Sequence, residues 1–234
     1  EDYAYYSSYS SYWLDHAKTY INQMSERFHL DSQSNVLEVA ANDGYLLQYV
    51  KENNIPCYGI EPTHGTALVA RQKGIEIIEE FFGEQLAMDL SNQGRQADLI
   101  VANNVLGHVP DINDFVKGFG ILLKIDGVAT FEFPYLVNLV EKNQFDTIYH
   151  EHYSYLSLNA VKTIFEFNGL HVFDVELIKT HGGSLRVFAE RSDRESKRPE
   201  TKIVEKLLLN EGRSGYLTKD GYSGVQLNAE KAKD

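Results

Sequence analysis

The chain has 234 residues, 43% of them hydrophobic, which is enough for one large α/β domain or two small ones with a buried core. Its 34 acidic and 22 basic residues give a net charge of -12, which argues against nucleic-acid binding because contacts to the phosphate backbone require clustered Lys and Arg. The single cysteine, Cys57, excludes an internal disulfide and a cysteine-rich metal site, and no apolar run approaches the roughly 20 residues of a membrane span.

In chain order, a Tyr- and Ser-rich head precedes a helix predicted near residues 14–28. Beyond it, short apolar runs alternate with amphipathic segments, which is the pattern of strands separated by helices. The strands are predicted at the start of 34–54 and over 55–61, 75–82, 96–109 and 128–134, with helices at the end of 34–54 and over 63–74 and 112–127. The fourth strand is continuously apolar, which is typical of a parallel strand covered on both faces.

Five strands in this succession predict a doubly wound parallel sheet. After a helix over 158–169, residues 170–180 and 184–192 predict two more strands. These two should pair antiparallel, because the connection between them is too short for a helix. The order matches that of the class I methyltransferases, so we predict an α/β, Rossmann-like sheet that is mostly parallel with an antiparallel final strand.

The pattern divides the chain into three parts. Residues 1–30 form an N-terminal Tyr-rich cap and helix, 31–190 form the ligand-binding domain, and 191–234 form a charged C-terminal segment. Within the last part, 198–212 predict a helix, whereas the residues after it show no sustained period.

The loop after the first strand, "EVAANDGY", indicates the kind of ligand. Ligands of open parallel sheets bind beyond the carboxyl ends of the strands, and a dinucleotide loop there would be glycine-rich to admit a pyrophosphate. This loop has one glycine, Gly44, and it carries Asp43, whose charge repels a pyrophosphate. The same carboxylate suits an ammonium or sulfonium group, which favours S-adenosylmethionine (SAM) over NAD.

Two further strand ends carry polar side chains. Glu61, before Pro62, ends the second strand and is placed to accept the hydroxyl groups of a ribose. Asn103 and Asn104 end the fourth strand and offer amide groups to a ligand. Each residue alone could equally be a solvated loop residue or a helix cap, as Asn42 and Asp43 could be, but three successive strand ends together predict a cofactor site.

The stretch "FDTIYHEHYSYLS", residues 145–157, combines two imidazoles, a carboxylate and several phenols. If it were extended, His150 and His152 would lie on one face and could bind a metal ion. The tyrosines could also serve only as packing surface. Three other histidines, His16, His29 and His171, are expected to be structural or exposed. The glycines of "THGGS", near His181, are expected to serve a turn.

Several of these segments resemble the SAM-dependent C-methyltransferases of nucleotide-linked deoxy-keto-sugars. The resemblance runs from residue 1 to about 189 and rests on "LEVAANDGYLLQY", "YGIEP", "DLIVANNVLGHVPDINDFV", "EFPYL", "NQFDTIYHEHYSYLSL" and "THGGSLRVF". It implies a central methyltransferase domain from a longer protein, with an N-terminal zinc module missing and 191–234 as the start of a missing C-terminal module.

The resemblance also implies site residues. It makes His152 the general base that forms an enolate, supported by Tyr149, Glu151 and His108, with no metal ion. Apart from the resemblance, Tyr3 to Tyr12 are interpreted as a lid over the cofactor, with the alternative that they only pack where the missing N-terminal module would join. The full predicted set for binding SAM, or its product S-adenosylhomocysteine (SAH), is Glu38, Ala40, Asn42, Asp43, Gly44, Glu61, Pro62, Phe82, Asn103, Asn104 and Tyr12.

The predicted function is therefore SAM-dependent C-methylation of a carbon next to a ketone in a nucleotide-linked, dTDP-type deoxy-sugar. Two alternatives stay open: a non-catalytic or truncated SAM-binding module, and an O- or N-methyltransferase acting on a small molecule. We expect neither nucleic acid nor a membrane as a partner. The single cysteine and the absence of a visible signal peptide predict a cytoplasmic location.

Overall fold

The computed structural model describes residues 5–233, which divide into two compact units. One unit holds the chain up to Ala102 together with Lys117–Ala129. The other holds Asn103–Val116 together with the chain from Thr130 onward. Strand β5, Leu123–Pro134, runs from the first unit into the second.

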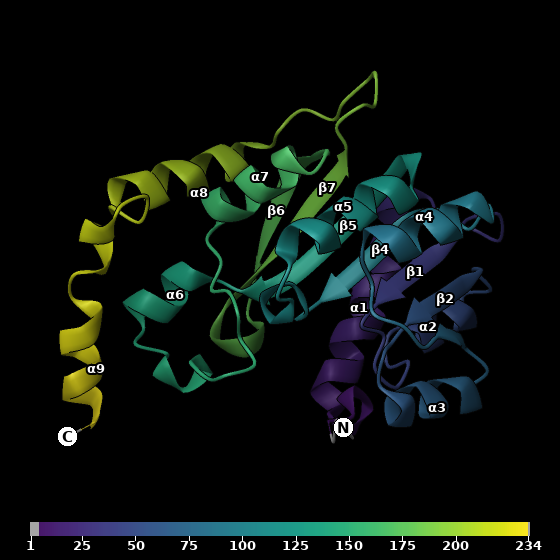
Figure 1. Ribbon diagram of the computed structural model, residues 1–234, viewed down its shortest axis with the longest axis horizontal. Coiled ribbons are helices and arrows are strands. Elements are labelled where there is room, and N and C mark those ends of the chain that lie inside the picture. Colours follow the sequence, from purple (N-terminus) through teal and green to yellow (C-terminus); the bar gives the residue numbers. More distant parts are fainter. Residues whose placement is uncertain (1–4, 234) are drawn as a thin grey trace. The chain divides into compact units, whose positions relative to one another are not determined.

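The first unit alternates strands with helices, as predicted (Figure 1). Its inner strands are almost completely buried, because side chains on both faces are covered, whereas the edge strand at residues 76–78 is partly exposed. In chain order the elements are η1 Ser7–Tyr9, α1 Ser11–Phe28, β1 Val36–Val39, α2 Leu47–Glu52, β2 Cys57–Ile60, α3 His64–Gln72, β3 Glu76–Ile78, α4 Glu84–Asn92 and β4 Ala97–Asn103, and then α5 Ile112–Leu122, which returns the chain to this unit.

The seven strands are hydrogen-bonded in the order β3-β2-β1-β4-β5-β7-β6. β1 pairs in parallel with both β2 and β4, so the strand order reverses at β1, where an open α/β sheet binds its ligands. The last two strands, β6 Leu170–Ile178 and β7 Ser184–Arg191, pair antiparallel as predicted. The sequence did not predict that β7 would lie between β5 and β6.

Some predicted boundaries are wrong. β3 ends at Ile78 instead of continuing to residue 82, and β5 begins at Leu123, inside the stretch predicted as helix and turn. An apolar run such as the one around Leu122 and Leu123 fits the end of a buried helix and the start of a buried strand equally well. Helices α4, α6 and α9 were not predicted.

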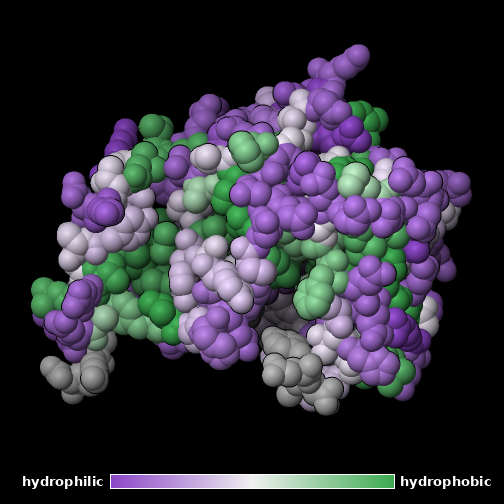
Figure 2. Space-filling model, in the orientation of Figure 1, coloured by the Kyte–Doolittle hydropathy of each residue, from purple (hydrophilic) through white to green (hydrophobic). Residues whose placement is uncertain are grey.

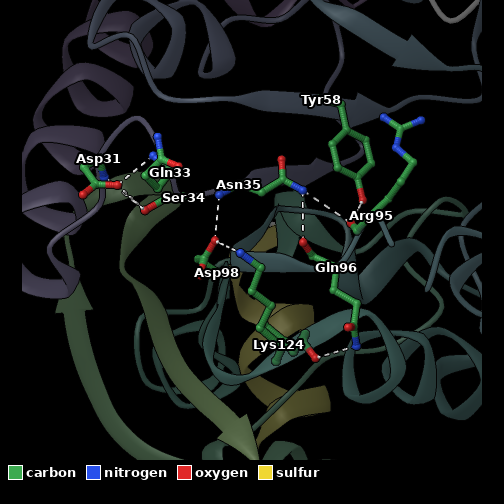
Figure 3. Close-up of polar contacts among 10 residues, drawn as sticks. Asp31, Gln33, Ser34, Asn35, Tyr58, Arg95, Gln96, Asp98 and Lys124 are labelled. Atoms are coloured by element: carbon green, nitrogen blue, oxygen red, sulfur yellow. Dashed lines mark hydrogen bonds and ion pairs between the residues drawn. The ribbon is translucent and has the colours of Figure 1, made fainter. Parts of the chain in front are cut away.

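A polar network fixes the amino ends of the strands in the first unit (Figure 3). Asp98 at the start of β4 accepts hydrogen bonds from the backbone N–H of Asn35 (2.7 Å) and from Nζ of Lys124 (2.6 Å). The Asn35 side chain donates in turn to the carbonyl of Gln96 at 3.1 Å. These contacts tie β1, β4 and β5 together at the edge opposite the one that binds ligands in such sheets.

The second unit contains the remaining elements. They are η2 Leu106–His108, α6 Leu136–Glu141, η3 Phe145–Thr147, α7 Leu158–Phe167, β6, η4 Thr180–Gly182, β7, α8 Lys202–Arg213, η5 Lys219–Tyr222 and α9 Val225–Lys233. Its core gathers aromatic side chains, including Phe131 and Phe165, whose ring centroids are 4.6 Å apart.

The charged C-terminal segment is helical over much of its length. α8 lies along α7 and β6 and buries Val204 and Leu207 (Figure 1). Leu209, Leu217 and Leu227 are each more than half exposed, and Figure 2 shows apolar side chains on the surface around α6 and α9. That residues 191–234 begin a further module stays a prediction.

Candidate active site

The loop after β1 has a glycine-like backbone although it contains a single glycine. Ala40, Asn42 and Gly44 all have positive φ angles, of 59°, 48° and 75°. This left-handed region is costly for alanine and tolerated by asparagine and glycine. At Gly44 a Cβ would also be crowded, because it would lie 2.5 Å from Cδ1 of Ile75, which would have to move.

The N-terminal head lies on this loop. The backbone N–H of Ser7 donates to Oδ1 of Asn42 at 2.9 Å, and Nδ2 of Asn42 donates to the carbonyl of Tyr5 at 3.0 Å. Ser8 donates to Oδ2 of Asp43 through both its hydroxyl and its backbone N–H. The side chains of Asn42 and Asp43 are not helix caps, because α2 begins only at Leu47 and has no side-chain cap.

These contacts attach the head to the predicted cofactor loop. The lid itself stays a prediction, and Tyr3 lies outside the described residues. Tyr12, on α1, is 62% exposed.

Carboxylates predominate at the carboxyl ends of the strands in the first unit, where open parallel sheets bind their ligands. Glu61 is buried and its two oxygens accept the backbone N–H groups of Asn42 and Thr63, both at 2.9 Å, which leaves lone pairs for further donors. Asp43 is fully buried, and its Oδ1 has no hydrogen-bond partner among the described residues. Burial also raises the pKa of Glu38 well above its usual value.

This set fits the predicted cofactor better than a dinucleotide. Lys73, with Nζ 3.7 Å from Oδ2 of Asp43, offsets only part of the negative charge. Buried acceptors at the ends of β1 and β2 repel a pyrophosphate, but they suit an ammonium group and the hydroxyl groups of a ribose.

The other predicted cofactor residues are less distinctive. Pro62 follows Glu61, and the ring of Phe82 packs edge-on against Phe119 of α5 at 5.1 Å. In the second unit, Asn103 is buried at the end of β4, and the N–H of Asn104 donates to the carbonyl of Glu132 at 2.7 Å. Their roles in cofactor binding stay predictions.

The second unit brings the predicted acid–base residues together. The ring centroid of His152 lies 4.6 Å from that of His108 and 4.3 Å from that of Tyr149. The backbone explains this approach, because the carbonyl of Gly107 accepts the N–H groups of Tyr153 (2.8 Å) and Ser154 (3.1 Å). Residues from two distant loops therefore form one cluster.

A hydrogen bond sets the tautomer of His152. Its Nδ1 lies 2.7 Å from the carbonyl oxygen of Thr147, which can only accept, so Nδ1 carries the proton. The lone pair of the neutral ring is then on Nε2, as a general base requires. Burial, followed by the neighbouring His152, lowers the pKa of His108, so that imidazole is neutral at pH 7.

The extended conformation on which a metal pair of His150 and His152 depended is not observed. Residues 149–151 form a turn, and the His150 side chain is 91% exposed. No group of three or more His, Cys, Asp or Glu in the described part of the chain could hold a metal ion.

Two participants were missed by the sequence. Thr147 and Gly107 act through their carbonyl oxygens, so no pattern of side chains in the sequence could have predicted them.

Glu151 acts on His108, although the Glu151 side chain is 44% exposed. Its charge and its backbone raise the pKa of His108, against the effect of burial. The side chain of His181 lies outside the described part.

Comparison with known proteins identifies the family. Residues 12–175 match the family described as a methyltransferase domain. The chain belongs to this family. The predicted methyltransferase is thereby confirmed at the level of family and fold, and no helix in the described residues is long and apolar enough to cross a membrane.

One curated relative is the C-methyltransferase NovU of Streptomyces niveus, which is 35% identical over 187 residues. The match covers 80% of this chain and 44% of NovU, so the chain spans less than half of that relative.

Solved structures share the fold at low identity. Magnesium protoporphyrin IX methyltransferase from Synechocystis PCC 6803 with bound SAH has a TM-score of 0.59 at 14% identity, covering 76% of this chain and 83% of that chain. The PH0226 protein from Pyrococcus horikoshii OT3 has a TM-score of 0.65 at 13% identity, covering 80% and 94%. These matches confirm the predicted class I methyltransferase fold.

Proposed function

We propose that this domain binds SAM and that the protein containing it methylates a carbon next to a ketone in a nucleotide-linked, dTDP-type deoxy-sugar. The observation that carries the proposal is the His152 tautomer, fixed by the Thr147 carbonyl with Nε2 as the basic atom beside a neutral imidazole. Support for carbon as the acceptor comes from NovU, which is named a C-methyltransferase.

On the substrate side, Nε2 of His152 removes the proton from the carbon beside the ketone. The Thr147 carbonyl stabilises the resulting imidazolium through Nδ1–H. Burial raises the pKa of Tyr149, so its hydroxyl stays protonated and can donate to the enolate oxygen. Glu151 and His108 hold the geometry of the cluster. The enolate carbon would be the nucleophile for the methyl group that SAM supplies.

On the cofactor side, SAM supplies an electrophilic methyl group and leaves as the thioether SAH. Glu61 would accept the ribose hydroxyls, and Oδ1 of Asp43 would accept the ammonium of the methionine part. Both roles use acceptors that the fold has already buried and oriented, so little reorganisation is needed on binding.

The test replaces His152 by Ala, with His150→Ala as the matched control from the same motif. In the full-length protein, His152→Ala should lower turnover by roughly 10²–10⁴-fold. It should also stop solvent deuterium from entering the substrate carbon, while calorimetry shows unchanged SAH affinity. His150→Ala should behave like the wild type, because that side chain is solvent-exposed.

Three results would contradict the proposal. Wild-type deuterium exchange in His152→Ala would place the base elsewhere, with His108 as the next candidate. Binding of NAD without binding of SAM would remove the cofactor assignment. A methyl group found by NMR on oxygen or nitrogen would establish the O- or N-methyltransferase alternative.

A further inference from the structure

Glu211 is a buried carboxylate outside the segment that matches the methyltransferase family. It lies on α8, is 1% exposed, and accepts three hydrogen bonds from other residues of the second unit. The donors are the Tyr135 hydroxyl (2.7 Å), the N–H of Leu158 (2.7 Å) and the N–H of Asn159 (2.9 Å). A carboxylate this deeply buried is expensive unless its partners compensate for the lost water, and here they do.

Two of those donors begin helix α7. The first N–H groups of a helix have no partner within the helix and carry its positive end. Glu211 accepts the first two, and the Ser157 hydroxyl oxygen accepts the N–H of Ala160 at 3.1 Å. The α7 amino end is therefore capped partly by its own chain and partly by α8.

The third donor ties Glu211 to the end of β5. Tyr135 directly follows β5, and its backbone forms a parallel bridge with Leu156. The N–H of Leu136 donates to the carbonyl of Leu156 at 3.1 Å. The chain that follows His152 is therefore held at two places. Tyr135 and Leu136 bind it at Leu156, and Glu211 binds it at the start of α7.

We infer that Glu211 is a positioning residue that holds the His152 segment in its catalytic geometry. The inference rests on the proposed role of His152, since it explains how the Nδ1 contact with the Thr147 carbonyl is maintained. An error of about 1 Å in a catalytic group can cost on the order of 100-fold in rate.

Glu211→Gln in the full-length protein tests the inference. The amide keeps the size but offers one acceptor oxygen and turns its NH₂ toward an N–H donor. We expect turnover to fall roughly 10–100-fold, with unchanged SAH affinity. The ¹⁵N NMR signals of His152 should change from the Nδ1–H form to a mixture of tautomers. Glu205→Gln, exposed on the same helix, is the matched control and should leave both readouts unchanged.

Tyr135→Phe provides a second variant in case Glu211→Gln does not fold. It removes one of the three hydrogen bonds and leaves the helix cap intact, so the same changes should appear at smaller size. Wild-type tautomer and turnover in a folded Glu211→Gln or Tyr135→Phe protein would overturn the inference. The tautomer signal needs no substrate, so it still decides the positioning role if His152→Ala shows that the proposed function is wrong.

Discussion

Ala40, Asn42 and Gly44 show that a loop can keep a left-handed backbone with one glycine in place of three. The hydrogen bonds of the loop hold it there, since the N–H of Asn42 is bound by Glu61 and its side chain by the head. Holding alanine at a φ of 59° costs roughly 1–2 kcal/mol, which these contacts offset. The single glycine in the loop indicated that a dinucleotide is disfavoured, but it did not indicate the left-handed backbone at residues 40, 42 and 44.

Gly44→Ala should destabilise the protein by about 2–4 kcal/mol. The left-handed φ contributes roughly 1–2 kcal/mol, and the clash of a Cβ with Ile75 adds the cost of overpacking. Urea unfolding measures the loss. Gly94→Ala is the matched control, because Gly94 has a φ of 73° but no atom within 4 Å of its Cβ position. Equal losses in the two variants would show that packing at Gly44 is unimportant.

At the scale of elements, two short turns carry most of the acid–base cluster. The 3₁₀ turn η2 carries His108, and the turn at residues 149–151 carries Tyr149 and precedes His152. Neither turn has a hydrophobic period, so the sequence predicted the acid–base residues but not the contacts between them. The carbonyl of Gly107 connects the two turns through the N–H groups of residues 153 and 154.

Gly107→Ala should reduce turnover while leaving SAH affinity unchanged. A Cβ at this position would lie 3.0 Å from the carbonyl oxygen of Ser154, so the two loops must move apart. The resulting shift of His152 should lower the rate by roughly 10–100-fold, as measured by methyl transfer. Wild-type turnover would mean that the contact between η2 and residues 153–154 does not set the geometry.

At the scale of the whole molecule, a buried ion pair crosses the C-terminal half of the sheet. Nε of Arg186, on β7, donates to Oε1 of Glu132 on β5 at 2.7 Å, and both side chains are almost completely buried. The same guanidinium reaches Glu176 on β6 at 2.8 Å. Three strands that the sequence predicted only separately are joined by one arginine.

Glu132→Gln should cost about 3 kcal/mol of stability, because it leaves the charge of Arg186 buried beside a neutral amide. Glu176→Gln should cost less than about 1 kcal/mol, since the Glu176 side chain is 38% exposed and solvent screens the pair. Thermal or urea unfolding of both variants separates the two cases. A small loss in Glu132→Gln would show that the hydrogen bonds matter there and the charge does not.

The sequence by itself determined the fold class and the residue types of both candidate sites. Apolar runs separated by amphipathic segments are local signals, and Asp43, Glu61 and the two histidines at 108 and 152 can be recognised from their places at strand ends and in a motif. Only the tertiary structure decided the rest: the position of β7, the proton on Nδ1 of His152, and the reach of Glu211 from α8 to α7. These depend on contacts between residues far apart in the chain, often through backbone carbonyls that every residue carries, so no local pattern encodes them.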